Sequence, residues 1–231
     1  ILLDAMAARG GGAYYPLDVS ADFLGETAEA LRDEYPSIDV HPVAGDLTDP
    51  LDPALDPPRP LLVAFLGSTI GNFHAPQAVE ILAHVRERLK PGDHLLLGAD
   101  LRPSAGKTVA ELEAAYDDAA GVTADFNRNA LRVLNRRAGT DFDPDSWAHL
   151  ARYDAVEGRM EMHLVAERPL TIRVPGRGSV RFARGDSLRT EISCKYDRDS
   201  VAHLFSCARL RLMQWITDDR ERYALAVGSP A

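Results

Sequence analysis

Short apolar runs that end on acidic or glycine-rich turns alternate with helix-like segments along the first hundred residues. Residues 61–66 form an uninterrupted apolar run, and residues 94–100 form a second that ends on an acid. Such runs are typical of strands buried on both faces of a parallel sheet. Between them, residues 76–89 carry apolar side chains at helical spacing. The alternation predicts a doubly wound α/β sheet of Rossmann-like type.

Two further strands are expected nearer the start of the chain. Residues 13–20 and 39–46 are rich in strand-forming residues, and both segments include acids near their ends, Asp18 and Asp46. Residues 23–34 between them have helical character, with Ser20 or Asp22 as the cap. Ligands of such sheets bind at the carboxyl ends of the strands. The acids at these ends are therefore candidate ligand contacts.

Each of the two acids has a structural alternative. An acid at the tip of the second strand of a nucleotide-binding sheet usually accepts hydrogen bonds from ribose hydroxyls, which fits Asp18. Asp46 could accept from the exocyclic amine of an adenine. Aspartate also favours helix caps and turns, so spacing alone leaves both interpretations open.

A glycine-rich loop between the first strand and helix of such a sheet is not found. Residues 1–8 have the character of a helix, and the glycines at 10–12 follow that helix instead of preceding it. We therefore expect the first strand and its glycine loop to be missing from this sequence, which would then be truncated at its N-terminus.

The character of the chain changes after Asp100. Residues 108–120 and 122–137 are expected to be helices, and residues 161–166, 170–174 and 179–182 an antiparallel meander. The α/β pattern returns after Tyr196. This predicts a cofactor-binding domain of residues 1–104 and 196–231, interrupted by an α+β substrate-binding domain of residues 105–195.

Charge and composition narrow the class of partner. The formal net charge is −9, and residues 1–60 hold 12 acids against 3 bases, so the excess lies in the first quarter of the chain. An acidic surface repels phosphate backbones, which argues against nucleic acid. The apolar runs are too short for a membrane span, and two cysteines suit a reducing compartment. We expect a cytoplasmic monomer that binds a small molecule and no membrane.

Other catalytic patterns are absent from the sequence. The seven histidines and two cysteines do not have metal-ligand spacing, so no metal is expected. Neither a nucleophile elbow nor a phosphate-binding P-loop is found.

Several blocks, taken together, resemble the histidine-specific, S-adenosylmethionine-dependent N-methyltransferases of ergothioneine biosynthesis. The blocks, in family order, are Tyr15-Pro-Leu-Asp-Val-Ser20, Phe65-Leu-Gly-Ser-Thr-Ile-Gly-Asn72, Lys90-Pro-Gly-Asp93, residues 115–124, 126–129, 138–142 and 159–162, and Thr190-Glu-Ile-Ser-Cys-Lys195. The family's N-terminal segment, which contacts substrate, and its glycine loop are not matched.

The resemblance implies a Rossmann-like class I methyltransferase domain with an inserted domain, and S-adenosylmethionine as cofactor. It implies that Asp18 contacts the ribose of the cofactor and that Asp46 and Leu47 contact its adenine. The substrate residues that it implies are Asn72 and Tyr116 at the α-amino and carboxylate end, Glu191 and Ser193 at the imidazole, and Met162 as an apolar wall. Asn72 and Tyr116 would also be the catalytic residues, since they orient the amino nitrogen.

The implied reaction is the threefold methylation of the α-amino nitrogen of L-histidine to trimethylhistidine (hercynine). Two alternatives remain at this stage. The protein could methylate another amino acid or an aromatic amine, or it could be a non-catalytic remnant. For each substrate residue, an ordinary role in the core, on the surface or in a loop is also open.

Overall fold

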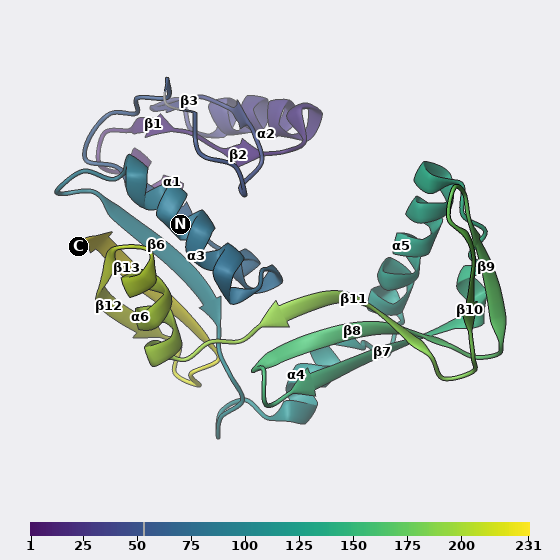
Figure 1. Cartoon of the computed structure of the whole chain (residues 1–231). Coiled ribbons are helices and arrows are strands. Elements are labelled where there is room, and N and C mark those ends of the chain that lie inside the picture. Colours follow the sequence, from purple (N-terminus) through teal and green to yellow (C-terminus); the bar gives the residue numbers. More distant parts are fainter. Residues whose placement is uncertain (53) are drawn as a thin grey trace.

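The main sheet has four strands in the order β12–β13–β6–β5 (Figure 1). The computed structural model describes residues 1–52 and 54–231. The strands of this sheet are β5 (Leu62–Phe65), β6 (His94–Asp100), β12 (Leu210–Thr217) and β13 (Tyr223–Pro230). β5 and β6 are parallel, whereas β13 is antiparallel to both of its neighbours. The expected strands at 61–66 and 94–100 are thus confirmed within one or two residues, and β12 and β13 account for the return of the α/β pattern after Tyr196.

Helices α3 (Ala75–Arg88) and α6 (Arg198–Cys207) contact each other and cover the core of this sheet. Fully buried side chains from both helices and from β6 form one apolar cluster, which includes Leu82, Leu97 and Phe205. The predicted burial of residues 61–66 on both faces is wrong. Val63 and Phe65 pack on the cluster, but Leu62 is 50% exposed and Leu66 39%. The strand therefore contributes alternate side chains to the core and leaves the others in solvent.

The N-terminal elements form a layer of their own. They are α1 (Leu2–Ala7), β1 (Gly12–Tyr14), β2 (Leu17–Asp18), α2 (Ala21–Glu34), β3 (Ile38–Val40) and β4 (Val43–Ala44). β1 pairs in parallel with β3, and β2 with β4. Each of the two strands expected here is split in two, at Pro16 and at Pro42. Proline has no backbone N–H, so it cannot donate to the ladder at those positions.

Residues 105–195, which we call the insertion, form separate sheets. Its helices are α4 (Val109–Tyr116) and α5 (Val122–Ala138), and its 3₁₀ turn is η2 (Pro144–Ser146). Its strands are β7 (Trp147–Asp154), β8 (Arg159–Ala166), β9 (Leu170–Val174), β10 (Gly178–Phe182) and β11 (Ser187–Cys194). They pair as β11–β8–β7 and as the hairpin β9–β10. The domain boundaries at 104/105 and 195/196 stay a prediction.

The expected meander is confirmed for its second half and wrong for its first. β9 and β10 form the antiparallel hairpin, but β8 pairs with β7 and β11 on its two sides instead of with β9. β7 was not expected, because polar residues interrupt its sequence. Its side chains nevertheless alternate in burial, with Trp147 and Ala151 buried.

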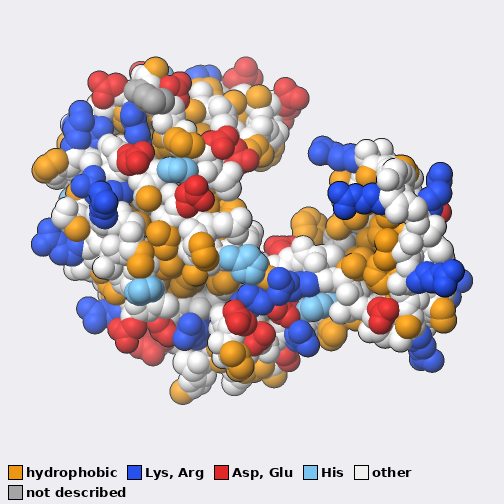
Figure 2. Space-filling model, in the orientation of Figure 1, with side chains coloured by type: hydrophobic (Ala, Val, Ile, Leu, Met, Phe, Trp, Pro, Cys, Tyr) orange, Lys and Arg blue, Asp and Glu red, His pale blue; other side chains and the backbone are white. Residues whose placement is uncertain are grey.

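Figure 2 shows an open hollow between the N-terminal elements and the insertion, with acidic side chains gathered over the former and basic ones over the latter. Among the described residues, no helix is both long and apolar enough to cross a bilayer.

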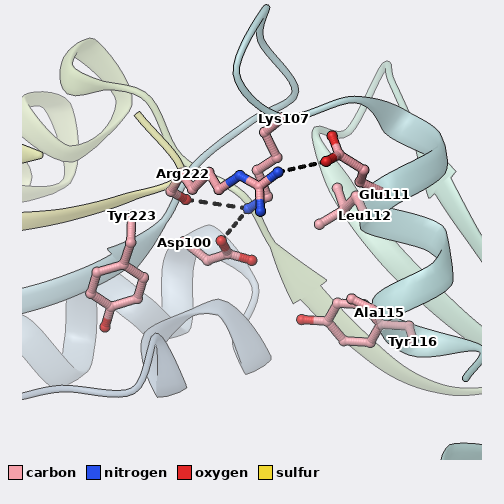
Figure 3. Close-up of a pocket in the computed structure, with 8 residues that line it drawn as sticks. All are labelled: Asp100, Lys107, Glu111, Leu112, Ala115, Tyr116, Arg222 and Tyr223. Carbon is pink, nitrogen blue, oxygen red and sulfur yellow. Dashed lines mark hydrogen bonds and ion pairs between the residues drawn. The ribbon is translucent and has the colours of Figure 1, made fainter. Parts of the chain in front are cut away.

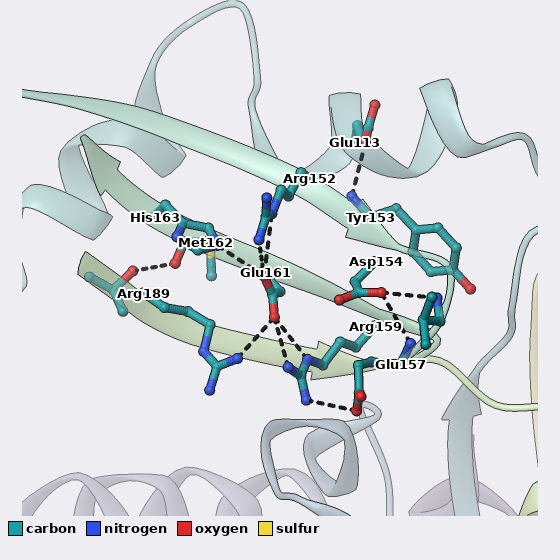
Figure 4. Close-up of polar contacts among 12 residues, drawn as sticks. Glu113, Arg152, Tyr153, Asp154, Glu157, Arg159, Glu161, Met162, His163 and Arg189 are labelled. Atoms are coloured by element: carbon teal, nitrogen blue, oxygen red, sulfur yellow. Dashed lines mark hydrogen bonds and ion pairs between the residues drawn. The ribbon is translucent and has the colours of Figure 1, made fainter. Parts of the chain in front are cut away.

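One face of the sheet β11–β8–β7 carries a cluster of charges around Glu161 (Figure 4). The Glu161 carboxylate is 3% exposed and accepts hydrogen bonds from Arg152, Arg159, Arg189 and His163. Burial opposes ionisation of Glu161, but these four donors outweigh it and hold the pKa of Glu161 well below its usual range. One buried carboxylate therefore connects all three strands.

Replacing Glu161 with glutamine should lower the free energy of unfolding by about 2–3 kcal/mol, because clustered arginines lose their counterion. Urea unfolding near pH 7 measures this loss. The matched control is Glu157→Gln, which removes an exposed acid that pairs with Arg159 alone and should change stability by less than about 0.5 kcal/mol.

The same pair of variants gives a pH test. Because the folded-state pKa of Glu161 is lowered, its contribution is complete above the unfolded-state pKa of about 4.5 and is lost as pH falls toward the folded value. The stability difference between wild type and Glu161→Gln should therefore be constant from about pH 8 to 6 and shrink below pH 4.5. A difference that shrinks already near pH 7 would contradict the assignment.

Candidate active site

Four of the five predicted substrate residues lie together on one face of the insertion. The strand pairing places Met162 directly opposite Glu191, and α4 covers this face with Tyr116 and Leu112. Glu191 and Ser193 alternate along β11, so both side chains point to the same side. A β-bulge between Arg189 and Glu191 re-aims this end of the strand.

Tyr116 and Ser193 are in direct contact. The Tyr116 hydroxyl donates to Ser193 Oγ at 3.0 Å. Ser193 and Met162 are buried, whereas Glu191 and Tyr116 are part-exposed and accessible to a small ligand. Burial raises the pKa of the Glu191 carboxyl above its usual range. The face therefore offers a carboxylate, two hydroxyls and a thioether within a small area.

Asn72 approaches this group from the main sheet. It ends the 3₁₀ turn η1 (Thr69–Asn72), which contacts β11, and its side chain is exposed. Gly71 is buried against the end of β11, and its lack of a side chain allows η1 to lie this close to the strand. A Cβ on Gly71 would lie 2.8 Å from the carbonyl oxygen of Cys194 and 3.5 Å from Ser193 Oγ.

A pocket of about 430 Å³ opens where the insertion meets the sheet (Figure 3). It is lined by Asp100, Lys107, Glu111, Leu112, Ala115, Tyr116, Arg222 and Tyr223. Of the predicted substrate residues, Tyr116 alone lines this pocket. Asn72 and Glu191 lie outside its lining, so a single cavity shared by all three is not found here.

The predicted cofactor residues lie in the N-terminal layer. Asp18 ends β2, Asp46 follows β4, and these two strands pair in parallel, so both carboxylates are exposed at the same edge. Leu47 is half-buried against the core of the main sheet. Asp18 belongs to β2 among the N-terminal elements, whereas Tyr116 and Glu191 belong to α4 and β11 of the insertion, which Figure 1 shows apart from β2.

Each of the two aspartates keeps acceptor capacity for a ligand. One oxygen of Asp18 accepts the Ser20 N–H, and one oxygen of Asp46 accepts the N–H and hydroxyl of Thr48. These hydrogen bonds hold the pKa of Asp46 below its usual range. The second oxygen of each has no protein hydrogen bond within residues 1–52 and 54–231, so the acceptor set suits ribose hydroxyls and an adenine amine. The residues present thus fit the adenosine part of the cofactor.

Two residues around Tyr116 were not singled out from the sequence as site residues, Lys195 and Asp100. Lys195 is 2% exposed, and its ammonium contacts Asp100, Tyr116 and Ser193. The sequence did contain a pattern that indicates Lys195, since Glu191, Ser193 and Lys195 are polar residues at every second position of one extended stretch. The position of Asp100 at a strand end was a further signal.

Known proteins are similar to this chain over nearly its whole length. The family model described as histidine-specific methyltransferase, SAM-dependent, matches residues 1–229. The chain belongs to this family. Among its relatives, the histidine N-alpha-methyltransferase of Mycolicibacterium smegmatis is 41% identical over 229 residues, which cover 98% of this chain and 70% of the relative. The protein of the same name from Mycobacterium tuberculosis is 39% identical and covers 99% of this chain and 70% of the relative.

A solved structure supports the fold of this methyltransferase. The S-adenosylmethionine-dependent methyltransferase from Clostridium acetobutylicum superposes with a TM-score of 0.51 at 10% sequence identity, covering 94% of this chain and 74% of that one. At this identity the likeness concerns the fold alone. It confirms the predicted Rossmann-like class I methyltransferase fold. The roles of the individual site residues stay predictions.

Gly71→Ala should separate η1 from β11 and lower the free energy of unfolding by about 1–3 kcal/mol, because the new Cβ meets backbone that cannot turn aside. Urea unfolding measures the loss.

Gly25→Ala in α2 is the matched control. An added Cβ there meets nothing within 4 Å, so this change should stabilise by about 0.5–1 kcal/mol. Equal effects of the two substitutions would contradict the close approach of η1 and β11.

Proposed function

We propose that this protein transfers methyl groups from S-adenosylmethionine to the α-amino nitrogen of L-histidine, giving trimethylhistidine (hercynine) as a step of ergothioneine biosynthesis. The observation that supports this most is the alternation of Glu191 and Ser193 on β11 beside the Tyr116 hydroxyl. A carboxylate and a hydroxyl two residues apart can hydrogen-bond both nitrogens of one imidazole. An indole has one nitrogen and an aliphatic side chain none, so neither uses both groups.

The site residues act by binding and orienting. When bound, S-adenosylmethionine supplies an electrophilic methyl group on a sulfonium. The α-amino nitrogen of histidine must be neutral to attack, because only the neutral form has a lone pair. In this proposal Asn72 and Tyr116 hold this nitrogen by hydrogen bonds that do not depend on its positive charge. Holding a nucleophile in near-attack geometry contributes much of the rate in such reactions.

The histidine ring and the cofactor would then be held by separate groups. Glu191 accepts the ring N–H, Met162 packs on the ring, and Asp18 with Asp46 and Leu47 holds the adenosine. Asp18 lies on β2 and Glu191 on β11 of the insertion, so we expect their energetic effects to be nearly independent.

The substrate assignment is tested with labelled S-adenosylmethionine and single amino acids, using the enzyme expressed from its complete reading frame. L-histidine should be labelled up to three times, and tryptophan and tyrosine much less. Preferential labelling of tryptophan or tyrosine would overturn the assignment. No labelled product together with no cofactor binding in calorimetry would favour a non-catalytic protein.

Two substitutions should separate the binding sites. Glu191→Ala should weaken histidine binding by about 10- to 100-fold, through loss of a charge-assisted hydrogen bond, and leave cofactor affinity within about 2-fold. Asp18→Ala should weaken cofactor binding and leave histidine affinity within about 2-fold. Titration calorimetry of each ligand measures both, and a strong cofactor defect in Glu191→Ala would show that this residue is misplaced.

A further inference from the structure

The ammonium of Lys195 uses all of its donors inside the protein. It donates to Asp100 Oδ2 at 2.6 Å, to the Tyr116 oxygen at 2.7 Å and to Ser193 Oγ at 2.9 Å. An ammonium has three N–H groups and no acceptor. Its direction of donation is therefore fixed in all three contacts, and no donor remains for a ligand.

The groups around this ammonium come from four elements. Asp100 ends β6, Tyr116 ends α4, Tyr153 lies on β7, and Cys194 is next to Lys195 in the chain. A second buried lysine, Lys107, contacts the other oxygen of Asp100 and the carbonyl oxygen of Leu101. Asp100 is therefore the counterion of both lysines.

Since Lys195 must donate, each of the two hydroxyl oxygens accepts from it, and neither hydroxyl can direct its proton to Lys195. One proton lies between Tyr116 and Ser193, and the phenol donates it to Ser193 Oγ. A phenol is the stronger donor and the alcohol the stronger acceptor, so this direction is favoured. Ser193 Oγ then accepts from both Lys195 and Tyr116, which occupy its two lone pairs. Its own O–H must point to a third group.

We propose that Lys195 is a positioning residue that maintains this polarity by occupying one lone pair of each hydroxyl and the facing oxygen of Asp100, so that Ser193 presents a donor to the substrate ring and Tyr116 presents only an acceptor to the substrate amine. The inference rests on the proposed function, because it assigns ring and amine to these residues. It adds which atom donates and which accepts, and names the residue that holds the two oxygens and Asp100 in this arrangement.

For the amine, the consequence is an unblocked lone pair. The Tyr116 proton is engaged by Ser193, and its oxygen has one lone pair left beside the Lys195 contact. It can accept an N–H of the α-amine but cannot donate to the nitrogen. A donated hydrogen bond would occupy the lone pair that attacks the methyl group.

For the ring, the consequence is selection of the neutral imidazole. Ser193 needs an unprotonated ring nitrogen as its acceptor, and Glu191 needs a ring N–H as its donor. Only the neutral ring supplies both. A ring without an acceptor leaves the buried Ser193 proton without a partner, which is unfavourable.

The test compares L-histidine with 3-(pyrrol-2-yl)alanine and 3-(pyrrol-3-yl)alanine, in which CH replaces one or the other ring nitrogen and the remaining nitrogen keeps its proton. Using both analogues makes the result independent of ring orientation. The enzyme from the complete reading frame should prefer histidine in kcat/KM by about 10- to 100-fold over either analogue. Lys195→Met removes the donors and keeps the apolar stem. It should lower this ratio about 10-fold, since the Ser193 proton can then turn to the oxygen of Asp100 that Lys195 no longer occupies.

Lys107→Met is the matched control, because it removes the other ammonium from Asp100 and touches neither hydroxyl. Its ratio of histidine to analogue should equal that of wild type, whatever happens to its stability. An unchanged ratio in Lys195→Met, or an equal fall in both variants, would overturn the proposal. Failure of the wild-type enzyme to methylate histidine at all would count against the proposed function instead.

A second measurement needs no variant, in case Lys195→Met does not fold. Ring-¹⁵N-labelled L-histidine is bound to the wild-type enzyme with S-adenosylhomocysteine at pH 6, where the free ring is mostly protonated. ¹⁵N NMR should show a neutral bound ring with one N–H. A bound imidazolium would overturn the proposal.

Discussion

The carboxylate of Asp100 joins the two parts of the molecule. The chain enters the insertion after Asp100 and leaves it at Lys195, and the ion pair between these two residues closes the junction. Backbone hydrogen bonds between Tyr196 and both Asp100 and Arg102 run beside it. Burying an ammonium without a partner is unfavourable, so the buried position of Lys195 depends on its ion pair with Asp100. The same ammonium then reaches Tyr116 and Ser193, and the junction thereby fixes the proposed substrate face.

Much of the fold could be predicted from local patterns. Apolar runs and helical periods located most elements, and the acids at strand ends located the edge where Asp18 and Asp46 lie together. Pairing could not be predicted in the same way. β8 lies between β7 and β11, and β11 comes from more than 20 residues farther along the chain. Such partners are chosen by packing, which a local pattern does not contain. The exposure of Leu62 could not be predicted for the same reason, because a run of apolar residues does not show which face of the strand other elements cover.

Some residues of the candidate site could be predicted from the sequence, and others could not. Tyr116, Met162, Glu191 and Ser193 were predicted through a family resemblance, and the fold brings these four together on one face. Their chemistry alone would not have assembled them, since Tyr116 and Ser193 are 77 positions apart. Lys195 was missed because a lysine in a sequence is normally a solvated surface residue. Its 2% exposure and its hydrogen bonds to Tyr116 and Ser193 place it beside the predicted residues.

The contact between Lys195 and the Tyr116 ring bears on how a growing cation could be held. The ammonium is 4.7 Å from the ring centre but 2.7 Å from the hydroxyl oxygen. The ammonium therefore makes a hydrogen bond to the oxygen and also lies over the ring as a cation–π contact. Each methylation removes an N–H from the substrate nitrogen and leaves a bulkier cation. As hydrogen bonds to the Tyr116 oxygen are lost, attraction to the ring can replace them. Because Lys195 already lies over the ring, a substrate cation held in this way would have to use the opposite face.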